Sequence, residues 1–277
     1  LIGSNFRIKG NDILFETGKR LLQIKSNKEL NPLVTIITVV KNNDKFLEET
    51  IKSVLNQSYK NFEYIIVDGK SKDSTLSKIK KYKKKIKFFS KKDKNLWEGI
   101  NTGIKNSNGQ IIGILNSKDL FNKNALKIVN KYFNLYDINY LFGAVKKRKV
   151  FHKFEPEKIY YRFNIYPSHS CSFFIARKTQ FKIGLYNAKY NYSADYDLFY
   201  KLFKNRNFRG MVTKKNEIIG KFDLYGMSSK VPFYKSYYIE MKIRFNNGQN
   251  FLYLLVLYFV KILNKLFNEI INFFNKT

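Results

Sequence analysis

A regular alternation of strand and helix patterns between residues 32 and 136 constrains the fold more than any other feature of the sequence. Residues 33–40 (LVTIITVV) form a continuous β-branched run, which is typical of a strand buried on both faces of a sheet. Residues 46–57 then carry apolar side chains at helical spacing, and further strand and helix patterns follow. This alternation predicts an α/β domain in which helices flank a mostly parallel sheet.

Polar clusters follow three of the predicted strands, at residues 41–43, 68–71 and 116–119. Ligands of parallel sheets bind at the carboxyl ends of the strands, where such clusters come together. We therefore expect a binding site at this edge of the sheet. After residue 136 the pattern changes: residues 140–154 predict a hairpin or a pair of strands, and residues 195–203 predict a helix.

Composition limits the kinds of ligand and metal site that we expect for this protein. The 277 residues carry a formal net charge of +31, which attracts nucleic acid, anionic lipid or phosphorylated ligands. An AT-rich genome would encode the same excess of lysine without any functional cause. The lysine-rich stretch 78–94 is explained more simply as a solvated helix face than as a nucleic-acid site, so we do not expect nucleic acid as a partner. One cysteine and two histidines argue against an ordinary zinc site.

The carboxyl-terminal part has a different character. Residues 251–260 are apolar and uncharged, and the segment after them is amphipathic. We interpret it as an interfacial helix that lies on an anionic membrane surface; the alternative is a helix that packs on the α/β domain or forms a dimer. We find neither a secretory signal nor an uncharged apolar run of about 18 residues that would span a bilayer. The expected organisation is a lead-in (1–31), an α/β domain (32–225) and a helical segment (226–277).

Five segments resemble family-2 glycosyltransferases in the order that this family shows. They include residues 65–75 (IIVDGKSKDST), 93–103 (DKNLWEGINTG), 109–119 (GQIIGILNSKD) and 193–198 (SADYDL), and the resemblance extends over residues 32–203. It implies a GT-A fold, a Rossmann-like and mostly parallel sheet. It also implies an inverting enzyme that takes a nucleoside diphosphate sugar and a glycan or lipid-linked acceptor for polysaccharide or lipopolysaccharide synthesis, assisted by Mn²⁺ or Mg²⁺.

The resemblance also assigns roles to individual residues. Asp195 matches the catalytic base, with Asp197 beside it as the alternative, and Asp119 matches a metal ligand. Asp197 and His169 fall on the acceptor side. The matching donor-binding positions are Val39, Asn42, Asp68, Lys70, Trp97, Glu98, Asn101, Asn116 and Lys118.

Each of these assignments has a structural alternative. Asp68 could be a turn residue, Asp119 the cap of a helix over residues 120–136, Asp197 an acid of a first helical turn, and Trp97 and His169 core residues.

Four lysines depart from the family pattern. Lys41, Lys70, Lys91 and Lys118 stand where the family has tyrosine, glycine, an acid and an acid of its metal signature. Lys118 either neutralises the diphosphate itself, with less need for metal, or leaves an inactive nucleotide- or glycan-binding protein. Because Asp119 and Asp195 remain, we expect an active enzyme, cytoplasmic and peripheral on the inner face of the membrane.

Overall fold

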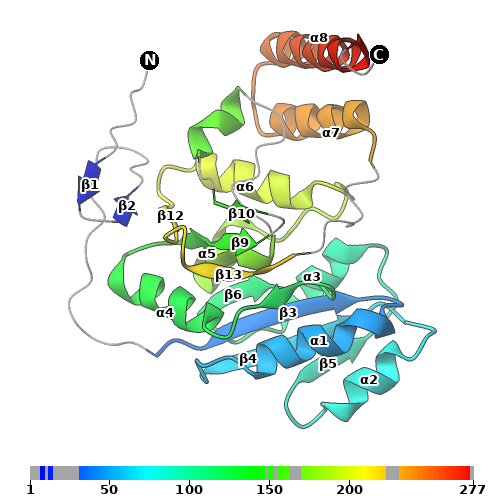
Figure 1. The fold of residues 1–277 in the computed structure, drawn as a ribbon, viewed down its shortest axis with the longest axis vertical. Coiled ribbons are helices and arrows are strands. Elements are labelled where there is room, and N and C mark those ends of the chain that lie inside the picture. The colour runs from blue at the N-terminus through cyan, green and yellow to red at the C-terminus, as the bar shows by residue number, and fades with distance from the viewer. Residues whose placement is uncertain are drawn as a thin grey trace.

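A computed structural model describes residues 7–9, 12–14, 31–146, 149–152, 155–161, 170–222 and 231–274. Its centre is a seven-stranded sheet in which all neighbours are parallel except those of β11 (Figure 1). The strand order is β12 (Gly210–Val212), β8 (Tyr140–Phe142), β11 (Phe173–Ala176), β6 (Ile111–Ile114), β3 (Val34–Val40), β4 (Phe62–Asp68) and β5 (Lys87–Ser90). The expected mostly parallel sheet is confirmed.

The register of the parallel strands brings their carboxyl ends level. Val40 at the end of β3 lies beside Asp68 at the end of β4, and Asp68 lies beside Ser90 at the end of β5. Every residue of β3 is buried, which explains its uninterrupted apolar and β-branched sequence.

Helices cover both faces of this sheet. On one face, α1 (Asp44–Leu55), α2 (Thr75–Lys81) and α4 (Ala125–Leu135) close one apolar core. On the other face, α3 (Leu96–Lys105) and α6 (Ala194–Lys204) close a second core. The helix α2 is short, because the chain turns at Tyr82 directly after it.

A second, four-stranded sheet has the order β10 (Val150–Phe151), β9 (Ala144–Lys146), β13 (Ile218–Lys221) and β7 (Leu120–Phe121). The hairpin expected over residues 140–154 is β9 and β10, which pair antiparallel. The preceding β8 instead joins the large sheet.

Two short helical turns, η1 (Pro156–Tyr160) and η2 (Ser170–Ser172), and the helix α5 (Arg177–Ile183) complete the described part of the domain. Near the amino terminus, β1 (Arg7–Lys9) and β2 (Asp12–Leu14) pair antiparallel.

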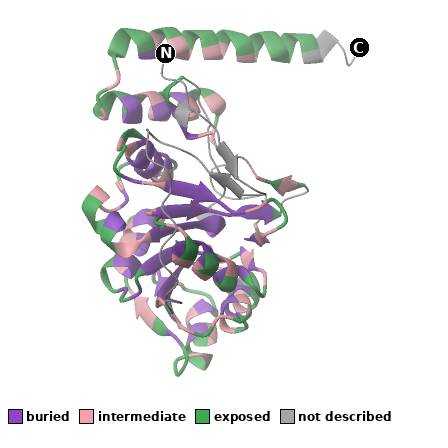
Figure 2. Cartoon of the chain, turned by 90° about the vertical axis from the view of Figure 1, so that its left-hand side faces the viewer, coloured by how far each residue is buried: buried purple, intermediate pink, exposed green. Residues whose placement is uncertain are grey.

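Two helices form the carboxyl-terminal part: α7 (Phe233–Asn246) packs on α6, and α8 (Phe251–Phe274) packs on α7 (Figure 1). Arg244 of α7 is fully buried and donates through Nε to the hydroxyl of Tyr196 in α6, at 2.8 Å. Most of α8 is exposed (Figure 2). In the ranges given above, no helix combines the length and the hydropathy needed to cross a membrane.

Candidate functional site

The loops that follow β3, β4 and β6 are hydrogen-bonded to one another. Asn43 Nδ2 donates to the backbone oxygen and the hydroxyl of Ser117, at 2.9 and 2.7 Å. The amide of Asn42 donates to Ser71 Oγ at 2.9 Å, and the amide of Lys72 donates to Asn42 Oδ1 at 2.8 Å. The three polar clusters therefore meet at one edge of the sheet, as the sequence predicts.

Two non-glycine residues of these loops have a left-handed backbone. The φ angles of Asn42 and Lys70 are 49° and 59°. Asn tolerates this conformation, whereas Lys costs about 1 kcal/mol or more there. A glycine would adopt this conformation at position 70 without that cost. Lys70 therefore adds backbone strain to the loop.

Asp68 ends β4 and is completely buried. Its carboxylate accepts the backbone amide of Ser71, at 3.2 and 3.3 Å to the two oxygens, and the hydroxyl of Ser90, at 2.6 Å. Asp68 is therefore more than a turn residue: it joins the ends of β4 and β5 and holds a fixed carboxylate at the centre of the edge. Ser71 belongs to the predicted 68–71 cluster, whereas sequence reasoning did not include Ser90 in the site.

Asp93 is a second carboxylate at this edge that sequence reasoning missed. Only 4% of its side chain is exposed, and Lys91 Nζ pairs with its Oδ1 at 3.3 Å. Among the described residues, neither carboxylate oxygen has a hydrogen-bond partner. The carboxylate lies against Gly99 of α3, where an added Cβ would be 3.2 Å from Asp93 Oδ2 and 2.7 Å from a methyl group of Val39. An acid directly after a strand, inside DKNLWEGINTG, was the available signal.

The amino terminus of α3 holds the segment that leads into α6. Asn95 caps α3 by accepting the amides of Trp97 and Glu98, and its Nδ2 donates to the backbone oxygen of Ala188 at 2.8 Å. The indole of Trp97 donates to the backbone oxygen of Asn191 at 2.9 Å. Glu98 folds back and accepts the amide of Lys94 at 2.9 Å.

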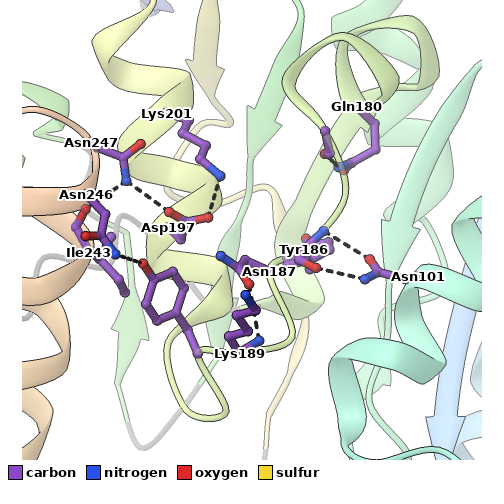
Figure 3. A network of polar contacts seen from close by, with 12 residues as sticks. Asn101, Gln180, Tyr186, Asn187, Lys189, Asp197, Lys201, Ile243, Asn246 and Asn247 are labelled. Atoms are coloured by element: carbon purple, nitrogen blue, oxygen red, sulfur yellow. Dashed lines mark hydrogen bonds and ion pairs between the residues drawn. The ribbon is translucent and has the colours of Figure 1, made fainter.

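Tyr186 is the centre of this contact. Its ring stacks on Trp97 with centroids 5.1 Å apart, and its backbone exchanges two hydrogen bonds with the side chain of Asn101, at 2.8 and 3.0 Å (Figure 3). Trp97 and Asn101 thus have clear positioning roles, and their contacts with a donor remain predictions.

Asp195 lies in the first turn of α6 and is half-buried. Burial raises the pKa of its carboxyl to about 6, although the amide of Tyr196 donates to Oδ1 at 2.9 Å and opposes the shift. Burial also raises the pKa of the Tyr186 hydroxyl, and the charge of Asp195 adds to that rise. Asp195 and Trp97 therefore both adjoin Tyr186, and a carboxylate with the basicity of a general base lies beside the α3 amino terminus.

Of the two residues predicted to lie on the acceptor side, the structure describes only Asp197. Asp197 is buried, pairs with Lys201 at 2.6 Å and accepts Asn247 Nδ2 at 3.0 Å, so it ties α6 to the end of α7 (Figure 3). These contacts agree with the structural alternative for Asp197, which is an acid of a first helical turn. His169 lies outside the described residues.

The segment 116–119 does not offer a conventional divalent-metal site. The carboxylate of Asp119 is buried and accepts Asn116 Nδ2 at 3.2 Å. Burial raises the pKa of the Cys171 thiol, and the charge of Asp119 adds to that rise. Lys118 is exposed, with Nζ 5.2 Å from the ring centroid of Phe46. Across the described ranges, no group of three or more His, Cys, Asp and Glu side chains could hold a metal ion.

The structure also tests the alternative that Asp119 caps a helix over residues 120–136. The residues that follow it form β7, and α4 begins only at Ala125 after the cap position Asn124. The expectation of a helix cap at Asp119 is therefore wrong, because a strand of the second sheet intervenes.

Comparison with known proteins identifies the family to which this sequence is similar. The family model described as "Glycosyl transferase family 2" matches residues 35–199. An uncharacterized glycosyltransferase of Rickettsia typhi is 32% identical over 189 residues, which are 63% of this chain and 59% of that protein. The poly(ribitol-phosphate) beta-N-acetylglucosaminyltransferase TarP of Staphylococcus aureus is 39% identical over 105 residues, 36% of this chain and 32% of TarP. The chain thus spans less than two thirds of these relatives.

Solved structures support the fold. TarS 1–349 of S. aureus in complex with UDP-GlcNAc has a TM-score of 0.55 at 17% identity, over 81% of this chain and 70% of that one. The mannosyltransferase PcManGT of Pyrobaculum calidifontis, in complex with GDP-Man and Mn²⁺, has a TM-score of 0.61 at 15% identity, over 89% and 68%. The expected GT-A architecture is confirmed.

Proposed function

Because the chain belongs to glycosyl transferase family 2, we propose that it moves a sugar from a nucleoside diphosphate sugar to a glycan or lipid-linked acceptor, with inversion at the anomeric carbon. The observation that carries this proposal is the convergence of four strand-end segments, which hold Asp68, Asp93 and the 116–119 turn at one edge. Solved neighbours whose structures contain UDP-GlcNAc or GDP-Man support the donor class.

The two fixed carboxylates at this edge suit the nucleoside half of the donor. Asp68 is held in one orientation by Ser71 and Ser90, so its remaining lone pairs can accept hydrogen bonds from a nucleobase or ribose. Asp93 has both oxygens without hydrogen-bond partners in a nearly buried position, where a sugar or ribose hydroxyl would relieve the cost of burial.

Asp195 supplies the base. The acceptor hydroxyl oxygen attacks the anomeric carbon, its proton passes to the Asp195 carboxylate, and the bond to the diphosphate breaks in the same displacement. A pKa of about 6 leaves the carboxylate ionised at neutral pH but more basic than an exposed aspartate. The described residues hold no group of three or more His, Cys, Asp and Glu side chains that fits a metal ion, and no step is assigned to one.

We also propose that α8 attaches the protein to an anionic membrane surface. The side chains of Leu263, Phe267 and Ile270 are 64%, 62% and 54% exposed, and they belong to a stripe that continues at helical spacing. The remaining members of the stripe are Leu252, Val256, Phe259, Val260, Leu266 and Ile271. The stripe points away from α7, because buried Leu254 and partly buried Lys261 and Lys265 occupy the opposite side.

Charge favours a membrane as the occupant of this face. Exposed Lys235 and Lys242, together with exposed Tyr234 and Tyr238, lie on α7, so they add positive charge and aromatic rings to the carboxyl-terminal part but do not belong to the stripe itself. The net charge of +31 acts in the same direction. Such placement would bring the site to a lipid-linked acceptor of polysaccharide or lipopolysaccharide synthesis.

Hydrolysis of UDP-GlcNAc and GDP-Man by the purified chain tests the central proposal. The expected result is slow release of the nucleoside diphosphate, which Asp195→Asn abolishes while the fold is retained. A protein that binds these nucleotide sugars but never turns them over, with or without acceptor glycans, would instead be the inactive binding protein that the lysine substitutions allow.

A further inference from the structure

We infer that the donor site neutralises the diphosphate with lysine ammonium groups in place of a divalent cation, and that Lys118 takes the largest share. This inference rests on the proposed function and concerns how the same site recognises its donor.

The topology brings four lysines to one edge. The strands β6, β3, β4 and β5 are consecutive parallel neighbours in the sheet. Each is followed within a few residues by an exposed lysine: Lys118, Lys41, Lys70 and Lys91, respectively. Because the carboxyl ends of parallel strands share an edge, these four ammonium groups border one site. The loop contacts of Asn42 and Asn43 hold three of the four segments together.

Printed contacts place three of these exposed lysines relative to their neighbours. Lys41 lies over Gly69, where an added Cβ would be 3.3 Å from both Cβ and Cδ of the lysine. Lys118 follows the 116–117 turn, with its ammonium 5.2 Å from the Phe46 ring centroid. The Lys91 ammonium lies 3.3 Å from Asp93 Oδ1.

The acids of this edge are not arranged to hold a cation. Asp68 accepts hydrogen bonds from Ser71 and Ser90, and Asp93 is paired with Lys91. Asp119 is buried and accepts the amide of Asn116. Mg²⁺ and Ca²⁺ require several oxygen ligands at about 2.0–2.6 Å.

The ammonium of Lys118, which belongs to the 116–119 turn, opposes the approach of a divalent cation to this turn. The same ammonium attracts a diphosphate. Lysine binds phosphate as a compact charge with three donors, so several lysines can match the charge that develops on a departing nucleoside diphosphate.

Isothermal titration of the full chain with UDP, GDP and dTDP, in EDTA and in Mn²⁺, tests this inference. We expect at least one nucleotide to bind with the same affinity, within about twofold, in both buffers. Lys118→Asp should weaken binding in EDTA by about 10- to 100-fold, the usual effect of losing a hydrogen bond to a charged group, and Mn²⁺ should restore much of the loss. Lys118→Gln should weaken binding similarly without any gain from Mn²⁺.

Lys105→Asp is the matched control. It makes the same change of charge at an exposed position at the end of α3, on the opposite edge of the sheet, and should leave the affinity in EDTA nearly unchanged. An equal loss in Lys105→Asp would overturn the inference, because the effect would then be one of overall charge.

Wild-type binding that requires Mn²⁺ would also overturn the inference but would leave the donor proposal intact. Absence of binding to all three nucleotides in both buffers, by folded protein, would overturn the proposed function itself.

Discussion

Asp195 combines two properties that a general base needs: a place beside the donor-side helix α3 and a pKa of about 6 produced by burial. The acceptor can lose its proton only to the ionised carboxylate, so kcat/KM should rise with pH through about 6 and level off above it. Asp195→Asn should lower turnover by about 10²- to 10⁴-fold, and initial rates across pH 4.5–8 on nucleotide-sugar hydrolysis would measure both effects. A profile without this acid limb would assign the base elsewhere.

The same pKa shift predicts a gain of stability when the acid is removed. The folded state raises the pKa of Asp195 from 3.8 to about 6, so it binds the proton more tightly than the unfolded chain does. The ionised carboxylate therefore destabilises the fold fully above about 6, and this penalty disappears as the pH falls toward 3.8.

Asp195→Asn should raise Tm at pH 7.5 and raise it much less at pH 4.5, which thermal unfolding at the two pH values would show. An equal gain at both pH values would mean that ionisation is not the cause.

Asp93 should matter for the donor more than for the fold. Asp93→Asn keeps the shape but removes the charge that pairs with Lys91, and it replaces one acceptor oxygen by a donor. We expect KM for the nucleotide sugar to increase about tenfold, with kcat changed less, because a ground-state contact is lost. Steady-state kinetics would separate the two parameters. A fall in kcat alone, at constant KM, would contradict the assignment of Asp93 to the donor.

The place of a residue could be predicted where it depends only on neighbours within one sequence motif. The places of Asp68 and Asp195 could be predicted because each stands at the end or start of a recognisable element, and their roles stay predictions. Asp93 was missed, because its importance comes from burial against Gly99 of α3, which is a contact between elements. Likewise, the positioning role of Asn101 depends on Tyr186, which is 85 residues away in the sequence.

At the scale of elements, α3 approaches β3 through glycines that bring it close to the strand. A Cβ on Gly103 would lie 2.4 Å from Ile37 Cγ2, and Ile37 is fully buried. Gly103→Ala should therefore destabilise the protein by about 1–3 kcal/mol through overpacking, offset in part by about 1 kcal/mol of helix propensity. Urea unfolding would measure this, with exposed Lys105→Ala on the same helix expected to stay within about 0.5 kcal/mol of wild type. A net stabilisation by Gly103→Ala would mean that α3 has room to shift.

The elements themselves were predictable to different degrees. The period and length of apolar runs indicated β3, α1 and α3, because each is fixed mainly by burial of its own face. The antiparallel place of β11 in the large sheet, and the joining of β7 and β13 to the β9–β10 hairpin in the second sheet, were not predictable. Their pairings join β7 to β13 and β8 to β11, which are distant in sequence, and such register depends on the rest of the fold.

At the scale of the whole molecule, the edge that holds the candidate site and the exposed face of α8 belong to one continuous structure. α8 packs on α7, and α7 is anchored by buried Arg244 to Tyr196, the neighbour of Asp195. A membrane bound by α8 would therefore set the distance between the lipid surface and the base. Under the membrane proposal, buried Arg244 would link the position of α8 at the lipid surface to α6.

The membrane proposal predicts a specific loss. In Leu263→Glu/Phe267→Glu, two of the most exposed apolar side chains of the stripe become charged. Each large apolar side chain contributes about 1.5–3 kcal/mol when it leaves water, so binding to phosphatidylglycerol vesicles should fall by at least about 100-fold. Co-sedimentation with vesicles would measure it, and neutral phosphatidylcholine vesicles should bind wild type more weakly.

Asn268→Glu is the control for that variant, since it adds an acid to an exposed position of the same helix outside the stripe. Its vesicle binding should stay close to that of wild type, because no apolar contact is lost and one added charge costs about 1 kcal/mol at most near an anionic surface. If the double variant binds vesicles as wild type does but changes the molecular mass in solution, the stripe is covered by a second copy of the chain and not by lipid.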